Sequence, residues 1–122
     1  MKLITLQEPL SVYQVSDLSQ INLQQKPLFI SHTEDELSIV SASKTVPQTT
    51  LNREDDWRAL KIEGVLDFSL VGILTTITSL LAAQKINVFA ISTYNTDYIL
   101  VKADSLSETI DVLKANDYIV ET

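Results

Sequence analysis

The sequence predicts an α+β protein of two related lobes, the second complete and the first truncated. Across residues 57–122, strand and helix patterns follow one another in the order strand, helix, strand, strand, helix, strand. An earlier segment, Leu28 to Ala42, resembles part of this region at an offset of 61 positions. A polar stretch from Lys44 to Asp56 separates the two. We therefore expect a first lobe with its connector at 1–56 and a second lobe at 57–122.

The second lobe opens with a strand at Trp57 to Glu63, where apolar and charged residues alternate. A helix follows, capped by Asp67 or Ser69 through a side-chain oxygen. Its apolar residues recur at helical spacing and are Leu70, Ile73, Leu74, Ile77, Leu80 and Leu81. Ile86 to Ser92 is apolar on both faces, which predicts a central strand.

The second half of this lobe continues with a strand at Tyr98 to Val101, paired to the preceding strand through the turn Thr93 to Asp97. Ser105 to Glu108 has the pattern of a capping box and predicts a helix that ends at Asn116. Tyr118 to Val120 is the last short strand. The complete order is that of the ferredoxin-like split unit, βαββαβ.

The first lobe is less complete. Leu10 to Val15 predicts a strand, Asp17 to Gln25 a short helix, and Leu28 to Ala42 a pair of strands. No second helix follows, so one face of the sheet lacks a cover and should lean on its neighbour or on another copy of the chain. At the offset of 61, Glu36 matches Asp97.

Charge and composition exclude several classes of function. The net charge of −7 is spread over both halves, with four basic and eight acidic residues in 1–56 and five basic and eight acidic in 57–122. Such a surface repels phosphate groups, so we expect no nucleic acid and no anionic membrane as partner. The most apolar stretch, Leu70 to Ala83, is too short for a bilayer span, and the N-terminus does not read as a signal peptide. We expect a cytoplasmic protein.

Catalytic and metal chemistry lack the residues they need. The chain has no cysteine, two glycines and one histidine, His32, which lies in a predicted turn. No nucleophile–base arrangement or glycine-rich phosphate loop is present. The acidic groups 34–36 and 54–56 lack calcium-loop spacing and are typical of solvated turns. We expect neither an enzyme nor a bound metal or cofactor.

Binding of a small zwitterion is the better hypothesis. A split unit brings the beginning of its first helix, near Gly72, to the turn that ends at Asp97. The free N–H groups of a helix start suit a carboxylate, and a glycine leaves that backbone open to approach. Asp97 suits an ammonium or guanidinium group. The pair therefore predicts a ligand with both charges, such as a free amino acid.

The same residues also have structural interpretations, and these remain open at this point. Gly72 would let the helix pack closely on the sheet. Asp97 would cap its turn by accepting from nearby N–H groups. Tyr94 and Tyr98 would belong to the core or its rim.

Two motifs carry a family resemblance. Asp-Phe-Ser-Leu-Val-Gly-Ile-Leu at 67–74, followed by Ile-Ser-Thr-Tyr-Asn-Thr-Asp-Tyr-Ile-Leu-Val at 91–101, resembles the ACT domain, and within it the two-lobed bacterial proteins of the CASTOR-like branch. The resemblance covers 57–122 closely and the first lobe loosely. It implies a regulatory module that binds an amino acid where domains associate side by side through their sheets, and thus a homo-oligomer, with a dimer favoured.

The resemblance also implies the ligand contacts. They would come from a loop and helix start and from a strand turn, matched here by Ser69, Leu70, Val71, Gly72, Ile73, Thr93, Tyr94, Asn95, Thr96 and Asp97. Asp97 stands where the branch has the acid that holds the cationic end of the ligand. Leu70 stands where the arginine-sensing members carry an acid, which argues against arginine and leaves a smaller amino acid open.

The expected function is therefore to sense an amino acid. Two alternatives are a ligand-free protein-interaction module and a regulatory subunit of an amino-acid biosynthetic enzyme. Glu36 would mark a second site if the repeat extends to function, or a solvated turn if it does not.

Overall fold

The computed structural model describes residues 1–64 and 72–122, which form two compact units. The C-terminal unit contains Met1–Gln7 and Arg58–Thr122, and the N-terminal unit contains Glu8–Trp57. The first seven residues thus belong with the C-terminal unit, which differs from the boundary expected between residues 56 and 57.

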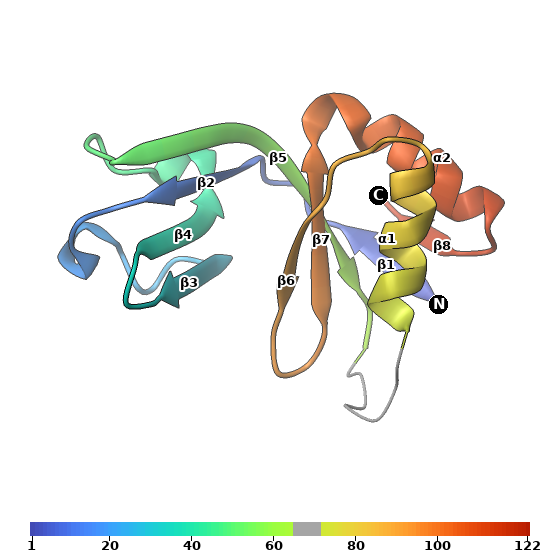
Figure 1. Cartoon of the computed structure of the whole chain (residues 1–122), viewed down its shortest axis with the longest axis horizontal. Coiled ribbons are helices and arrows are strands. Elements are labelled where there is room, and N and C mark those ends of the chain that lie inside the picture. Colours follow the sequence, from blue (N-terminus) through green and yellow to red (C-terminus); the bar gives the residue numbers. More distant parts are fainter. Residues whose placement is uncertain (65–71) are drawn as a thin grey trace. The chain divides into compact units, whose positions relative to one another are not determined.

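In its described residues, the C-terminal unit contains a mixed sheet and two α-helices. Its described elements are β1 (Lys2–Thr5), β5 (Asn52–Ile62, of which 58–62 belong here), α1 (Ile73–Ala83), β6 (Phe89–Ser92), β7 (Asp97–Lys102), the 3-10 turn η3 (Ala103–Ser105), α2 (Leu106–Ala115) and β8 (Ile119–Glu121). The strands lie in the order β6-β7-β5-β1-β8, and both helices lie on one side of them (Figure 1). The predicted α+β ferredoxin-like class is confirmed.

The N-terminal strand β1 is an addition to the ferredoxin-like plan, and the sequence pattern does not predict it. It lies between β5 and β8, antiparallel to the first and parallel to the second. Leu3 pairs with Ile62 on one side and with Val120 on the other, and it is fully buried. A four-residue strand with polar neighbours gains its stability from these two long-range partners, which local periodicity does not reveal.

One hydrophobic core holds the helices to this sheet. Alternate strand residues face the helices, as the pleat requires. The buried members of the core are Leu3, Leu60, Ile62, Ile77, Leu81, Ile86, Ile99, Val101, Leu113 and Val120. Burying each such large aliphatic side chain stabilises the unit by about 1.5–3 kcal/mol.

Both helices differ from expectation at their beginnings. α1 begins at Ile73 with Gly72 as its N-cap, and no described side chain caps it; the expected caps Asp67 and Ser69, and Leu70, lie outside the described residues. The capping box expected at Ser105 is wrong, because η3 runs directly into α2. Ser105 has helical angles (φ −98°, ψ −2°) and makes no capping bond, whereas a capping side chain needs an extended backbone. The predicted end of α2 at Asn116 is confirmed.

The expectation of a central strand at 86–92 is wrong. β6 starts only at Phe89, and among the described strands it pairs with β7 alone. Ile86 and Val88, which produced the two-faced apolar pattern, precede the strand and pack on the core. An apolar connection that packs inward therefore has the same local pattern as a central strand.

The N-terminal unit repeats the strand order of a split unit without its helices. Its elements are β2 (Leu10–Gln14), the 3-10 turn η1 (Leu18–Gln20), β3 (Leu28–His32), β4 (Leu37–Ala42), the 3-10 turn η2 (Ser43–Thr45) and residues 52–57 of β5. Its strands lie in the order β3-β4-β2-β5. The predicted strands are confirmed, but the helix expected at 17–25 is only the short turn η1.

A capping box that the sequence pattern did not suggest holds η1. The Asp17 carboxylate accepts from the N–H of Ser19 at 2.8 Å, and the N–H of Asp17 donates to Gln20 Oε1 at 3.2 Å. The hydrogen bond from Ser19 lowers the pKa of Asp17. The expected helix is therefore a single 3-10 turn, closed by these two side-chain hydrogen bonds.

The polar connector expected at 44–56 is wrong in its last five residues, because β5 begins at Asn52. Asn52 pairs with Gln14 and Arg53 with Tyr13 of β2. The pairing shifts register before Trp57, where Asp56 has a φ of +69°. This is the geometry of a β-bulge. Backbone pairing outweighs polar composition here, since the side chains of these residues stay largely exposed.

A chain of hydroxyl groups, of which those of Tyr13 and Ser41 are buried, holds η2 to the sheet of the N-terminal unit. Thr45 Oγ1 donates to the carbonyl of Ala42 at 2.8 Å. The Ser41 hydroxyl therefore donates to Thr45 (3.2 Å), and the Tyr13 hydroxyl donates to Ser41 (2.7 Å). Each hydroxyl carries one hydrogen, so this chain has a single direction. It anchors the short segment that stands where a second helix would begin.

The C-terminal end of α1 offers a stability test. The N–H groups of Lys85 and Ile86 donate to the carbonyls of Ala82 (2.9 Å) and Leu81 (3.0 Å), the Schellman pattern, with Lys85 at a φ of +60°. Lys85→Gly should raise the free energy of unfolding by about 0.5–1 kcal/mol, because glycine adopts this conformation without strain. Urea unfolding measures the change. Lys85→Ala, which removes the charge but keeps Cβ, should give no such gain, and equal stability of the two variants would contradict the argument.

Candidate functional site

The turn between β6 and β7 is closed by its own threonine. The N–H of Thr93 donates to the carbonyl of Thr96 at 2.8 Å, and Thr93 Oγ1 donates to the same carbonyl at 3.0 Å. The N–H of Thr96 in turn donates to Thr93 Oγ1 at 3.3 Å. The Thr93 hydroxyl thus serves the turn itself.

Thr96 anchors the turn to the end of β5. Its side chain is buried, with 3% of the residue exposed, and its hydroxyl donates to the carbonyl of Ile62 at 2.8 Å. Thr96, expected among the ligand contacts, thus gives its hydroxyl hydrogen to the fold. The bond places the end of β5 beside the beginning of β7.

Asp97, the first residue of β7, is half-buried and held by its cross-strand neighbour. Ser92 Oγ donates to Asp97 Oδ1 at 2.5 Å. Asp97 alternates with Ile99 and Val101, whose side chains belong to the core beneath the helices. Its side chain is therefore on the helix-covered face of the sheet.

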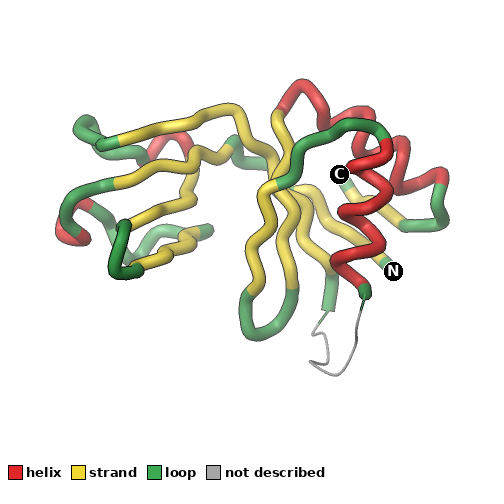
Figure 2. The backbone as a smooth tube through the Cα atoms, viewed as in Figure 1, coloured by secondary structure: helices red, strands yellow, loops and turns green. Residues whose placement is uncertain are grey.

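The beginning of α1 lies at the same end of the C-terminal unit as this turn (Figure 2). Gly72, its N-cap, has a φ of +81°, and a Cβ built there would meet no described atom within 4 Å. Close packing against the described residues therefore does not require a glycine at position 72. The left-handed backbone conformation does favour glycine there.

The two predicted halves of the site therefore share one face and one end of the unit. The first intrahelical bond of α1 runs from the N–H of Thr76 to the carbonyl of Gly72 at 2.8 Å. The N–H groups of Ile73 and the next two residues precede this bond and carry the positive end of the helix dipole. A carboxylate, Asp97, stands on the same side. This arrangement is electrostatically complementary to a small molecule with a negative and a positive end.

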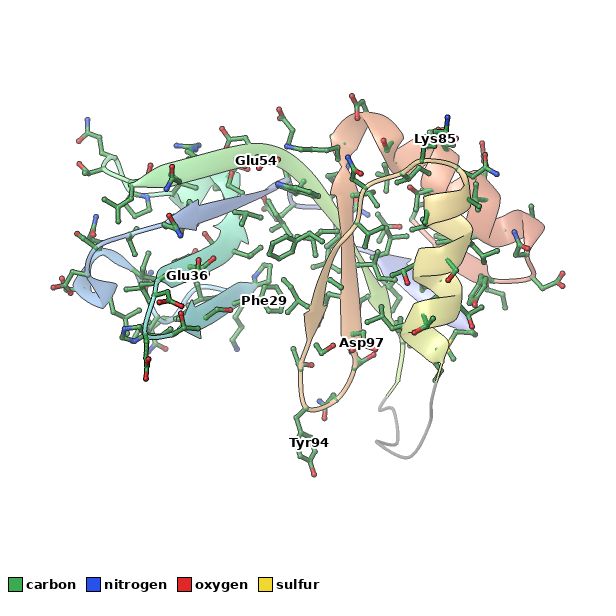
Figure 3. All side chains as sticks on the ribbon, in the orientation of Figure 1. Phe29, Glu36, Glu54, Lys85, Tyr94 and Asp97 are labelled. Carbon is green, nitrogen blue, oxygen red and sulfur yellow. The ribbon has the colours of Figure 1, made fainter. Side chains whose placement is uncertain are left out.

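Of the other predicted contacts, some lie elsewhere and some lie outside the described residues. Tyr94 is 79% exposed and extends away from the unit at the tip of the turn (Figure 3). Asn95 is exposed beside it. Ser69, Leu70 and Val71 lie outside the described residues.

Ser92 is the residue that sequence reasoning missed. Its position directly opposite Asp97 follows from the hairpin register. The signal was present: a hydroxyl and a carboxylate flank a four-residue turn, and such flanking residues pair across a hairpin.

The hairpin of the N-terminal unit repeats the turn but not the acid. The N–H of Thr33 donates to the carbonyl of Glu36 at 2.9 Å, and the N–H of Glu36 donates to Thr33 Oγ1 at 3.2 Å, as in the turn at Thr93. His32 pairs with Leu37 as Ser92 pairs with Asp97. The structural offset is thus 60 positions, and the predicted match of Glu36 with Asp97 is wrong.

Glu36 occupies the place of Thr96 and accepts from Gln14 Nε2 at 3.0 Å. Of the two interpretations left open for Glu36, the second site therefore lacks the cross-strand carboxylate that Asp97 provides in the C-terminal unit. In the described part of the chain, no three side chains of the metal-ligating types gather closely enough to hold an ion. None of the helices in 1–64 and 72–122 has the length and apolarity to cross a bilayer.

Comparison with known proteins assigns the family. The model of the ACT domain matches residues 52–115. The chain belongs to the ACT domain family. A 59-residue stretch is 41% identical to cytosolic arginine sensor for mTORC1 subunit 1 of Rattus norvegicus, and it spans 48% of this chain and 18% of that protein. The expected resemblance to the CASTOR-like ACT proteins is confirmed.

Solved structures share the architecture over nearly the whole chain. The crystal structure of protein Atu0741 from Agrobacterium tumefaciens has a TM-score of 0.85 at 28% identity and covers 98% of this chain and 90% of its own. VC0802 from Vibrio cholerae has a TM-score of 0.75 at 16% identity (91% and 85% covered). The regulatory subunit of aspartate kinase from Thermus thermophilus has 0.60 at 6% identity (93% and 95% covered), which shows the fold alone.

The anchoring bond of the turn is testable. Thr96→Val keeps the shape of the side chain but leaves the Ile62 carbonyl without this donor. The free energy of unfolding should fall by about 1–2 kcal/mol, and amide exchange in the turn should accelerate. Thr75→Val, an exposed position on α1, is the control and should change stability by less than about 0.5 kcal/mol. Equal stability of both variants would show that the bond does not hold the turn.

Proposed function

We propose that this protein binds a free amino acid, or a similar small zwitterion, and reports its level to a regulated process without catalysing a reaction. The proposal is carried by one observation: Asp97 and the N-terminal end of α1 occupy the same face and end of an ACT unit. The 59-residue match to an arginine sensor supports it.

In this proposal the ligand's two charges meet two different groups. The carboxylate binds the first N–H groups of α1, near Gly72 and Ile73, where the helix dipole is positive. The ammonium binds the Asp97 carboxylate. The main chain of Thr93, Tyr94 and Asn95 lines the turn beside it. Ser69, Leu70 and Val71 would complete the site from the segment before α1.

The identity of the ligand and the assembly are part of the proposal. An apolar Leu70 in the site would favour a smaller amino acid over arginine, since a long basic side chain would lack an acidic partner there. The protein is proposed to act as a homo-oligomer, most simply a dimer, in the cytoplasm. The edge strand β6, whose outer side pairs with no described strand, is where a sheet could be continued by a second copy.

A thermal-shift screen with the twenty standard L-amino acids, one at a time, tests the proposal. A ligand at 100 times its Kd stabilises the folded state by about 2.7 kcal/mol, which raises Tm by roughly 10 °C for a chain of this size. The N-acetyl derivative of the best amino acid lacks the ammonium and should give no shift.

Two matched variants assign the shift to the site. Asp97→Asn should remove most of the shift and leave the Tm of the ligand-free protein nearly unchanged, because the amide oxygen still accepts from Ser92. Glu36→Gln, at the corresponding turn of the N-terminal unit, should keep it in full. The absence of a shift with every amino acid at millimolar concentration would contradict the proposal and favour a ligand-free interaction module.

A further inference from the structure

Asp97 is held by a hydrogen bond from Ser92, a residue that the proposed function does not use. Ser92 is the last residue of β6 and faces the first residue of β7. We propose that Ser92 is a positioning residue of the ligand site: its hydroxyl holds the Asp97 carboxylate in the orientation that receives the cationic group. This inference rests on the proposed function and adds a residue to it.

The hydrogen bond from Ser92 to Asp97 belongs to the stronger class of hydrogen bonds, those that involve a charged group. A hydroxyl that donates to a carboxylate over 2.5 Å is a charge-assisted hydrogen bond at the short end of its range. A half-exposed aspartate without such a donor would sample several orientations of its carboxylate. Fixing it before the ligand arrives removes an ordering penalty from the binding step.

The bond leaves the carboxylate available for a cation. It engages Oδ1 and leaves Oδ2 without a hydrogen bond from the described residues. Lys2, Lys44 and Arg53 form ion pairs with other carboxylates, and none of these pairs includes Asp97. The carboxylate is thus oriented without being neutralised by a described basic side chain, as a receptor for an ammonium group requires.

The hairpin of the N-terminal unit shows whether the Ser92–Asp97 pair is needed to form a turn of this type. That hairpin closes with two of the same threonine bonds, yet it has His32 and Leu37 where the C-terminal unit has Ser92 and Asp97. A four-residue turn of this type therefore forms without a hydroxyl–carboxylate pair. The pair is an addition to the turn, and the addition lies on the face where α1 begins.

Isothermal titration of each of the twenty standard L-amino acids into the full chain tests the inference. Ser92→Ala should raise the Kd of whichever amino acid binds by about tenfold, the loss expected for one hydrogen bond to a charged group. Ser92→Thr keeps the hydroxyl on an edge strand that tolerates branching and should bind within about twofold of the wild type. Ser31→Ala, an exposed serine of the other hairpin, is the matched control and should bind as the wild type does.

A double mutant shows whether Ser92 acts through Asp97. In the Asp97→Asn background, where binding is weak, Ser92→Ala should cause no further loss at high amino-acid concentration, because the group that it positions is gone. NMR of the ligand-free Ser92→Ala protein should show averaging of the Asp97 χ1 angle, a readout that needs no ligand.

The outcomes are distinguishable. Unchanged affinity of Ser92→Ala, or equal losses in Ser92→Ala and Ser92→Thr, would overturn the positioning role while the proposed function stands. Absence of binding by the wild type would overturn the proposed function and this inference together, even if the χ1 averaging is observed.

Discussion

A single buried hydrogen bond sets the geometry on which the candidate site depends. The Thr96 hydroxyl donates to the Ile62 carbonyl and fixes the β6–β7 turn at the end of β5. Because strands alternate their faces, Asp97 then falls on the side covered by the helices. α1, the next described element after β5, begins at this same end. The opposed charges of the site therefore follow from the topology of the split unit and from one anchored turn.

The sequence predicted the fold class and most elements of the C-terminal unit, because their patterns are local. Its errors share one cause, the dependence of some elements on distant partners. β1 and residues 52–56 are strands through pairing with β8, β5 and β2, and their own residues are polar or mixed. Ile86 and Val88 mimic a central strand because they pack on the core from a connection. Ser105 lost its capping role to a preceding 3-10 turn.

The candidate site was predicted in part. Asp97 and Gly72 could be identified from spacing and charge, whereas Ser92 required the hairpin register. Matching identical residues such as Val40 and Val101 gave an offset of 61, one more than the structural value, and that slip assigned an acid to the wrong turn. With the register corrected, the N-terminal unit keeps the turn and lacks the carboxylate. The two units are alike in plan, and only the C-terminal one combines the acid with a helix beginning.

The most direct measurement of the central claim is the map of amide chemical shifts in an NMR titration with the amino acid that stabilises the protein. The account predicts that the largest changes fall at the beginning of α1, around Gly72 and Ile73, and at residues 92–97, with those at 32–37 unchanged. Changes confined to the N-terminal unit, or to only one of the two predicted segments, would contradict a site built from a helix dipole and a facing carboxylate.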